Sequence, residues 1–193
     1  MHGLINRSIE SFLRDSYGEA AWNSVADALG IEREGFEPFR RYPDADTHCL
    51  VAIGARVLAK PEAEFLEDVG AWLARIEPAR RLLRFSGADF ADFVLALEEL
   101  PGRAHLVLPD LDMPRISVLV QGEAQFCVAV THSFPEWRCV LAGVLRAMSD
   151  EYGALALIVD EGAYISVDVS DDSFGAARDF DLGAGPRAHR EAI

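Results

Sequence analysis

The sequence predicts an α+β fold, in which a lobe of helices precedes a small antiparallel four-stranded sheet with one helix packed on it. Apolar residues recur at helical spacing through the first hundred residues and at the alternating spacing of strands after that. Two pairs of strands flank one strongly periodic helix, an order that is typical of an antiparallel sheet covered on one face. We expect a single domain over residues 1–170, with a helical lobe over about 1–84, a helix over 86–100 and a sheet lobe over about 103–170.

Glycine and proline residues divide the helical lobe. One apolar stripe ends near Gly18 and the next ends at Gly30, where a left-handed C-terminal cap is expected. Residues 32–45 contain one glycine and two prolines and are predicted to form a loop. An apolar stripe over 50–58 predicts a third helix, and a fourth is predicted after Pro61, because proline fits the first turn of a helix.

The helix over 86–100 is delimited by a signal at each end. Ser86 and Asp89 resemble a capping box, which would begin the helix. Its inner face is predicted to carry Phe90, Phe93, Val94 and Leu97. Pro101 and Gly102 then predict that the helix stops, because proline is costly inside a helix and glycine favours an end.

Alternating apolar residues predict the four strands of the sheet. The strands are expected over 116–120, 126–130, 155–159 and 165–169. Gly122 would lie in the turn of the first hairpin, and residues 160–162 would form the turn of the second. The helix between the pairs is marked by Trp137, Val140, Leu141, Val144, Leu145 and Met148, and should stop near Gly153. Residues 171–193 are poor in aliphatic side chains and are expected to be a mostly disordered tail.

The chain is strongly acidic, with 32 acidic against 18 basic residues and a net charge of −14. This argues against nucleic-acid binding, because phosphates need a basic patch, and against docking on an anionic membrane. No apolar run reaches the ~18 residues of a transmembrane helix, and the first residues lack the layout of a signal peptide. Three scattered cysteines cannot form a disulfide framework. We therefore expect a cytoplasmic protein with reduced thiols.

No catalytic or metal-binding motif stands out. The phosphate-binding loop, the dinucleotide fingerprint, the zinc-protease motif and the nucleophile elbow are all missing from the sequence. Asp110 and Asp112 could bind a cation as a pair, but two carboxylates without a third favour a solvated loop. The cysteines and the central histidines match no usual zinc spacing. Without a visible nucleophile–base pair, we expect that the protein is not an enzyme. Taken one by one, His48, His105 and His132 are expected to be structural.

Two segments resemble the haem–nitric oxide/oxygen-binding (H-NOX) family. One is the opening stretch, Met-His-Gly-Leu-Ile-Asn-Arg-Ser-Ile-Glu-Ser-Phe-Leu-Arg-Asp-Ser-Tyr-Gly-Glu-Ala-Ala-Trp. The other begins Phe-Ser-Gly-Ala-Asp-Phe-Ala-Asp-Phe-Val at residue 85 and is followed by Leu-Pro-Asp-Leu-Asp-Met-Pro at 108–114. The resemblance covers about residues 1–170, and the predicted order of helices and sheet agrees with the H-NOX fold.

The resemblance implies a sensor that binds haem b between the helical lobe and the sheet lobe. Ile5 would then lie beside the haem, and a histidine near the end of the helix corresponding to 88–100 would bind the iron. Members of the family in bacteria report nitric oxide to a separate signalling protein, such as a histidine kinase or a cyclic-di-GMP enzyme. The resemblance therefore implies a partner of this kind, and the acidic surface favours a basic patch on it.

The chain departs from the family at both haem contacts. Pro101 occupies the position of the iron ligand, and proline has no side-chain donor atom. The family's Tyr-x-Ser-x-Arg motif, which binds the haem propionates, corresponds here to residues 131–135. Only Ser133 survives; Thr131 could still donate one hydrogen bond, and Pro135 replaces the arginine. His132 is expected to point to the other face of the strand from Thr131 and Ser133.

Substitute iron ligands can be named. His105 lies one helical turn beyond Pro101 and would approach the same face if the helix continued, although proline and glycine there favour a stop. Cys127 and Cys139 are weaker thiolate alternatives.

Two functions therefore remain open. One is a divergent H-NOX sensor that still holds haem, through His105 or without a protein ligand. The other, which the residues favour, is a haem-free interaction module or a binder of another apolar ligand. The pocket decides between them: if Phe93, Leu97 and Met148 fill it, haem cannot enter, whereas a slot beside Ile5 and Pro101 would admit a flat ligand.

Overall fold

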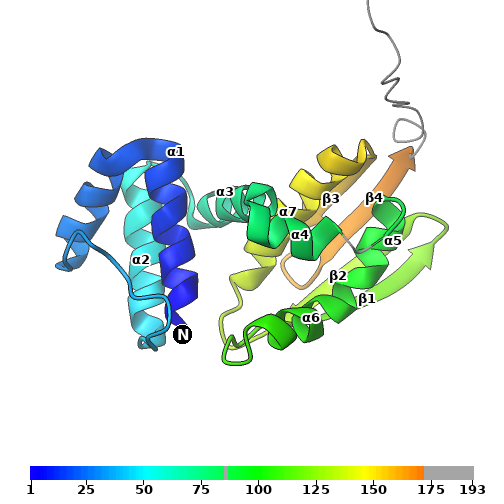
Figure 1. The fold of residues 1–193 in the computed structure, drawn as a ribbon. Coiled ribbons are helices and arrows are strands. Elements are labelled where there is room, and N and C mark those ends of the chain that lie inside the picture. The colour runs from blue at the N-terminus through cyan, green and yellow to red at the C-terminus, as the bar shows by residue number, and fades with distance from the viewer. Residues whose placement is uncertain (85–86, 172–193) are drawn as a thin grey trace, which may run out of the picture.

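The computed structural model describes residues 1–84 and 87–171 and confirms the α+β fold (Figure 1). In chain order its elements are α1 (Gly3–Leu29), α2 (Asp44–Val57), α3 (Glu62–Arg75), α4 (Glu77–Arg84), α5 (Phe90–Leu95), the 3₁₀ turn η1 (Ala96–Glu99), α6 (Leu100–Val107), β1 (Arg115–Gly122), β2 (Gln125–Thr131), α7 (Trp137–Tyr152), β3 (Leu155–Asp160) and β4 (Ile165–Asp171). The expected tail lies outside the described residues, except for Asp171 at the end of β4.

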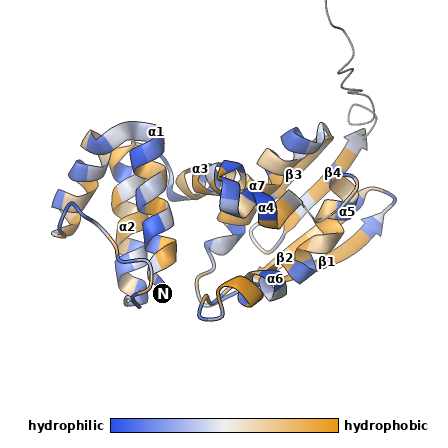
Figure 2. Cartoon of the chain, in the orientation of Figure 1, coloured by the Kyte–Doolittle hydropathy of each residue, from blue (hydrophilic) through white to orange (hydrophobic). Residues whose placement is uncertain are grey.

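The sheet has the strand order β1-β2-β4-β3, and every neighbouring pair is antiparallel. Both hairpins and the helix between them occur where the alternation predicted, and α7 ends at Gly153 in the left-handed region. The sequence predicted one covering helix, but α5 and η1 join α7 in packing on the sheet (Figure 1). Apolar residues run along all four strands (Figure 2). On the opposite face they are exposed at Leu119, Leu155 and Leu157.

Each edge strand of the sheet has one main-chain group bonded to a charged side chain. On β1, the N–H of Val118 donates to Glu98 Oε1 at 2.6 Å. On β3, the carbonyl of Ile158 accepts from Arg146 Nη2 at 3.2 Å. Charged side chains on an edge oppose pairing with another chain, so each edge is protected at this position.

Two hydrophobic cores meet where α3 crosses α7. Val69 and Val140 belong to the core of the helical lobe, while Ala74 and Val144 belong to the core under the sheet. At the crossing the helices touch backbone to backbone. A Cβ atom added to Gly70 would overlap the carbonyl oxygen of Val140, and one on Gly143 would overlap that of Glu67. The two glycines therefore allow one pair of helices to serve both cores.

The opening residues are explained by how α1 begins. His2 caps the helix, because its Nδ1 accepts a hydrogen bond from the N–H of Leu4 at 3.2 Å. Gly3 lies against the loop before α2 and donates its N–H to the carbonyl of Arg40 at 2.7 Å, where a side chain would overlap that carbonyl. The predicted break at Gly18 is present as a residue with φ of 81° inside α1.

Two predictions about the segment after α4 are wrong. The cap of α5 is Asp89, whose carboxylate accepts from the N–H of Asp92 at 2.8 Å, so the helix starts one turn later than a box begun by Ser86 would place it. Ser86 itself lies outside the described residues. The helical path also does not stop at Pro101 but continues to Val107, because Pro101 falls in the first turn of α6, where its missing N–H has no partner to lose.

None of the helices in the two described ranges combines the length and the apolar character needed to cross a bilayer.

Candidate functional site

A cavity of about 740 Å³ opens beside Pro101. It lies where η1 and α6, the segment before β1, the start of β1 and the residues that follow β2 come together. Its lining consists of Glu98, Pro101, Asp112, Met113, Pro114, Arg115, Ile116, Thr131, His132 and Ser133. This cavity, which we call the Pro101 cavity, is an open depression whose volume is within the range of about 300–1,000 Å³ found for small-molecule pockets.

The structure brings together three of the predicted site residues and leaves two outside. Pro101, Thr131 and Ser133 all line the cavity, although they come from separate parts of the chain. Ile5 is half-buried on α1 and is not part of the lining. His105 lies on α6 as the sequence allowed, but its side chain is exposed and also outside the lining.

His132 is also among the residues that line this cavity. Thr131 and Ser133 on either side of it are exposed, whereas its own side chain is buried. The side chain of His132 is only 6% exposed. Its ring meets Trp137 edge-on, with centroids 6.2 Å apart.

The hydrogen bonds of His132 decide where its proton lies. Nδ1 accepts the backbone N–H of Phe134 at 2.9 Å, so the neutral ring carries its proton on Nε2. Nε2 lies 3.3 Å from Asp112 Oδ2 but lacks hydrogen-bond alignment, and no other described residue accepts its proton. His132 Nε2 is therefore a buried N–H donor that is closed to solvent and lies beside the carboxylate of Asp112.

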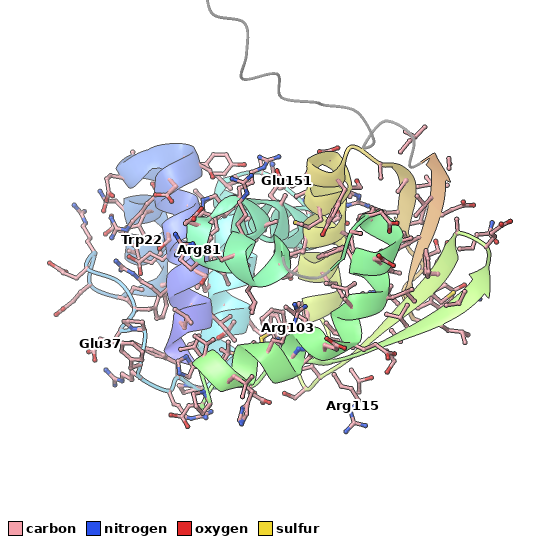
Figure 3. The ribbon with its side chains drawn as sticks, turned by 45° about the vertical axis from the view of Figure 1, so that its right-hand side comes forward. Trp22, Glu37, Arg81, Arg103, Arg115 and Glu151 are labelled. Carbon is pink, nitrogen blue, oxygen red and sulfur yellow. The ribbon has the colours of Figure 1, made fainter. Side chains whose placement is uncertain are left out.

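The charged groups around the cavity are mostly negative. Glu98 has one carboxylate oxygen fixed by the N–H of Val118. Asp112, expected to be only a solvated loop residue, is 70% exposed at the side chain and lies beside His132. Arg115 also lines the cavity and has the opposite charge. Its side chain is exposed at the start of β1 and projects away from the ribbon (Figure 3).

The interior next to the cavity is filled. Phe93, Leu97 and Met148 are each at most 1% exposed and belong to the core under the sheet. The sequence analysis expected haem to be excluded if these three side chains filled the pocket, and on the side of the sheet they do fill the interior. The other condition, a slot beside both Ile5 and Pro101, is met only at Pro101.

Neither buried cysteine lines the cavity. Cys127 lies on β2. The Sγ atom of Cys139 is 3.8 Å from Asp160 Oδ2. Burial and, next, the negative charge of Asp160 raise the pKa of the Cys139 thiol, which disfavours the thiolate that iron would need. No group of three or more histidine, cysteine, aspartate or glutamate side chains within the described ranges could hold a metal ion.

The residues around the cavity do not fit a bound haem iron. An iron-binding histidine needs a free ring nitrogen, while its other nitrogen usually donates a hydrogen bond. In His132 this arrangement is reversed, because Nδ1 accepts and Nε2 carries the proton. Pro101 offers no donor atom. Of the propionate-binding motif, Thr131 and Ser133 retain hydroxyls, but Glu98 and Asp112 would repel two propionate carboxylates.

Buried polar groups of α1, α2 and residues 132–137, which we call the polar seam, lie beside an apolar contact in which Phe134 joins the hydrophobic core of the helical lobe. On the helical side, Asn6 Oδ1 accepts from Thr47 Oγ1 at 2.7 Å, and both side chains are fully buried. Across the seam, His48 Nδ1 lies 3.6 Å from Glu136 Oε1. Asn6 Nδ2, Glu136 Oε2 and Trp137 Nε1 are buried and unpaired with any described residue. The polar seam therefore contains three buried polar atoms without a described partner, and one of them belongs to Trp137, whose ring contacts His132.

Sequence reasoning missed most of the cavity lining. Glu98, Met113, Pro114 and Arg115 received no role in a site, and Ile116 was expected only as a strand residue. The proximity of Pro101, Asp112 and His132 depends on how α6 and β1 pack, for which a single sequence carries no direct signal. The family segment at 108–114 was the one available indication, since it ends at the start of this wall.

The fold is shared with H-NOX proteins of known structure. A crystal structure of an H-NOX protein from S. oneidensis in the Fe(II)NO state aligns with a TM-score of 0.74 and 14% identity, over 89% of this chain and all of that one. A mutant of the T. Tengcongensis H-NOX protein aligns with a TM-score of 0.73 and 14% identity, over 89% of this chain and 98% of that one.

Sequence comparison gives the family as well as the fold. The profile of the Haem-NO-binding family matches residues 2–129, and the chain belongs to this family. Soluble guanylate cyclase gcy-31 of Caenorhabditis elegans is 25% identical over 118 residues, which make up 59% of this chain. The match covers 17% of the cyclase, so this chain corresponds to a small part of that relative. Domains of this family are sensors and are not themselves catalytic.

Proposed function

We propose that this chain is a sensory domain of the H-NOX type that works without haem and uses the Pro101 cavity for another ligand. The observation that carries the proposal is the pairing of Pro101 with His132 in one cavity. Pro101 cannot bind iron, and the N–H of Phe134 occupies Nδ1 of His132, which leaves the proton on the buried Nε2. The acidic residues Glu98 and Asp112 further oppose haem propionates.

The output of such a domain is a change in a signalling partner. We propose a separate protein, such as a histidine kinase or a cyclic-di-GMP enzyme, with a basic patch facing the acidic surface of this chain. The net charge of −14 supports that complementarity, because opposite charges speed association and orient the partners. We place the protein in the cytoplasm, where its three cysteines would remain reduced.

The competing function is a haem sensor with His105 as the ligand. The absorption spectrum of the protein, purified from cells supplied with a haem precursor, separates the two. We expect a colourless protein that also fails to take up added hemin. A strong Soret band at near-stoichiometric haem would contradict the proposal. Loss of that band in His105→Ala or in His132→Asn would then identify the ligand.

A further inference from the structure

We infer that the open face of the sheet is the docking surface for a basic amphipathic helix of the signalling partner. We call this surface the outer face, and it is opposite to the face on which α5, η1 and α7 pack. The inference rests on the proposed function for the existence of a partner. It adds where that partner binds and which side chains its docking segment carries.

Strand pairing gathers the exposed apolar side chains of the outer face into rows. Side chains alternate between the two faces of a sheet, so the positions between the buried core residues point outward. One row crosses all four strands with Leu119, Cys127, Ser166 and Val159. The next row contains Gln125, Asp168 and Leu157. Single exposed leucines are normal on a protein surface, whereas a contiguous apolar group marks an interaction site.

The outer face has high apolar borders and a low centre. The border strands β1 and β3 carry Leu119 and Leu157, which are each 64% exposed. The central strands carry the small side chains of Cys127, Ala129 and Ser166. Three spacings of about 4.8 Å place β1 and β3 roughly 14 Å apart. A helix with its side chains is about 10–12 Å wide, so one helix fits between the leucines and contacts the centre.

The charges on the outer face are mostly negative. Asp168 Oδ2 accepts from Gln125 Nε2 at 2.9 Å, and Glu161 Oε1 accepts from Ser166 Oγ at 3.2 Å. Neither carboxylate has an ion-pair partner within the described ranges. Among the outward positions of the four described strands, Arg115 is the one basic side chain, and it lies at the other end of β1 from these carboxylates. A docked helix would therefore carry lysine or arginine beside its apolar stripe.

The same charges disfavour a second copy of this chain as the occupant. Each copy has a net charge of −14, and pairing two outer faces would bring the Asp168 carboxylates of both copies into one apolar interface. Burying like charges together is costly. A basic helix buries the same leucines and neutralises these carboxylates.

The test is NMR of the full ¹⁵N-labelled chain titrated with a synthetic helical peptide. The probe is a capped peptide of about 15 residues made of leucine, alanine and lysine, with every leucine on one face of the helix. One control peptide has the same composition with the leucines dispersed, and another has glutamate in place of lysine. We expect the probe to shift the amide signals of Leu119, Cys127 and Val159 and to bind at least about tenfold more tightly than either control.

Variants of this chain provide the matched controls. Leu119→Ser combined with Leu157→Ser removes both apolar borders and should weaken the probe about tenfold or more. Asp168→Asn should weaken it about threefold, because a partly exposed ion pair contributes little. Leu106→Ser, at a leucine that is 84% exposed on α6, and Asp150→Asn, on α7, should bind the probe like the unaltered protein.

Several results would overturn the inference. These are equal binding of either control peptide, amide shifts that leave the outer face unchanged, and unaltered binding by the double leucine variant or by Asp168→Asn. A dimer of the unaltered chain in sedimentation that the double leucine variant dissociates would assign the face to a second copy. If Phe180→Ser, outside the described residues, shifted the signals of Leu119 and Val159 without peptide, the end of the chain itself would occupy the face.

Failure of this inference is distinguishable from failure of the proposed function. A colourless protein that does not bind the probe would retain the haem-free function and lose only this docking surface. A protein with a strong Soret band would overturn the proposed function whatever the peptide titration gives.

Discussion

The helical lobe meets the rest of the molecule at two contacts of opposite character. At the crossing of α3 and α7, Gly70 and Gly143 bring the backbones together with no side chain between them. At the polar seam, Asn6, Glu136 and Trp137 leave buried polar atoms without partners among the described residues. The first contact is closely packed, and the second has unmet hydrogen bonds.

The difference indicates where the structure can respond to a ligand. Close-packed backbones leave no room for adjustment, because small overlaps in a packed interior are costly. Unpaired polar groups, in contrast, lose little when they separate and gain when water or a ligand reaches them. The Pro101 cavity is near the polar seam, because His132 lines the cavity and its ring contacts Trp137 of the seam. We therefore expect the crossing to determine stability and the seam to determine response.

The largest effect should come from adding one methyl group to the crossing. Gly143→Ala places a Cβ against the carbonyl of Glu67, and the helices must separate. Alanine gains about 1 kcal/mol in helix propensity, but overpacking should leave a net loss of about 2 kcal/mol in the free energy of unfolding. Urea denaturation measures this. Gly102→Ala on α6, where a Cβ meets open space, is the matched control and should be stabilising or neutral. If both variants changed the free energy of unfolding by the same amount, the crossing would not be more closely packed than the open surface of α6.

The next effect concerns how α7 is held on the sheet between the two contacts. Arg138 Nε bonds Asp160 Oδ1 at 2.5 Å. Burial raises the pKa of Asp160, but Arg138 and the N–H of Gly162 lower it more, so the pKa is below its usual value. A lowered folded-state pKa stabilises the protein above the unfolded pKa of about 3.9 and ceases to do so as the pH falls through the folded pKa.

Asp160→Asn should therefore destabilise the protein by about 1–1.5 kcal/mol near neutral pH, with the difference from the unaltered protein shrinking below about pH 4. Denaturation curves over pH 3–7 check this. Asp150→Asn, which changes an exposed carboxylate on α7, should stay within about 0.5 kcal/mol. A loss from Asp160→Asn that persists at low pH would show that the charge of Asp160 is not the cause.

The smallest net effect should come from the seam itself. Thr47→Val removes the hydroxyl that donates to Asn6 and should cost about 1–2 kcal/mol, because Asn6 is then buried without any partner. Adding Asn6→Leu replaces both polar groups by apolar ones and should bring the free energy of unfolding back to within about 0.5 kcal/mol of the unaltered protein. Denaturation of the single and double variants measures this. If the double variant instead loses as much free energy of unfolding as the two single variants together, the polar seam tolerates change no better than the crossing does.

Most of the fold could be predicted from local sequence signals. The strands around Gly122, helix α7 and the caps at Gly30 and Gly153 each depend on spacing within a few residues, and all are confirmed. Pro101 shows the limit of such signals. A proline can end a helix or occupy the first turn of the next one, and only the packing of α6 decides between these outcomes.

The site could be predicted only in part. The family resemblance brought Pro101, Thr131 and Ser133 together, and all three line one cavity. It did not include His132, which also lines the cavity. That a backbone N–H of Phe134 holds the ring is a detail of the turn after β2, which residue types alone do not encode.

The backbone contact between α3 and α7 also constrains motion. Without side chains between them, the two helices have a fixed separation at Gly70 and Gly143, so their axes can change angle more easily than distance. We therefore expect a rearrangement of one lobe against the other to be a rotation about this point, in which each residue moves in proportion to its distance from it. A few degrees at the crossing become the largest displacements at the far ends of the sheet and of α1.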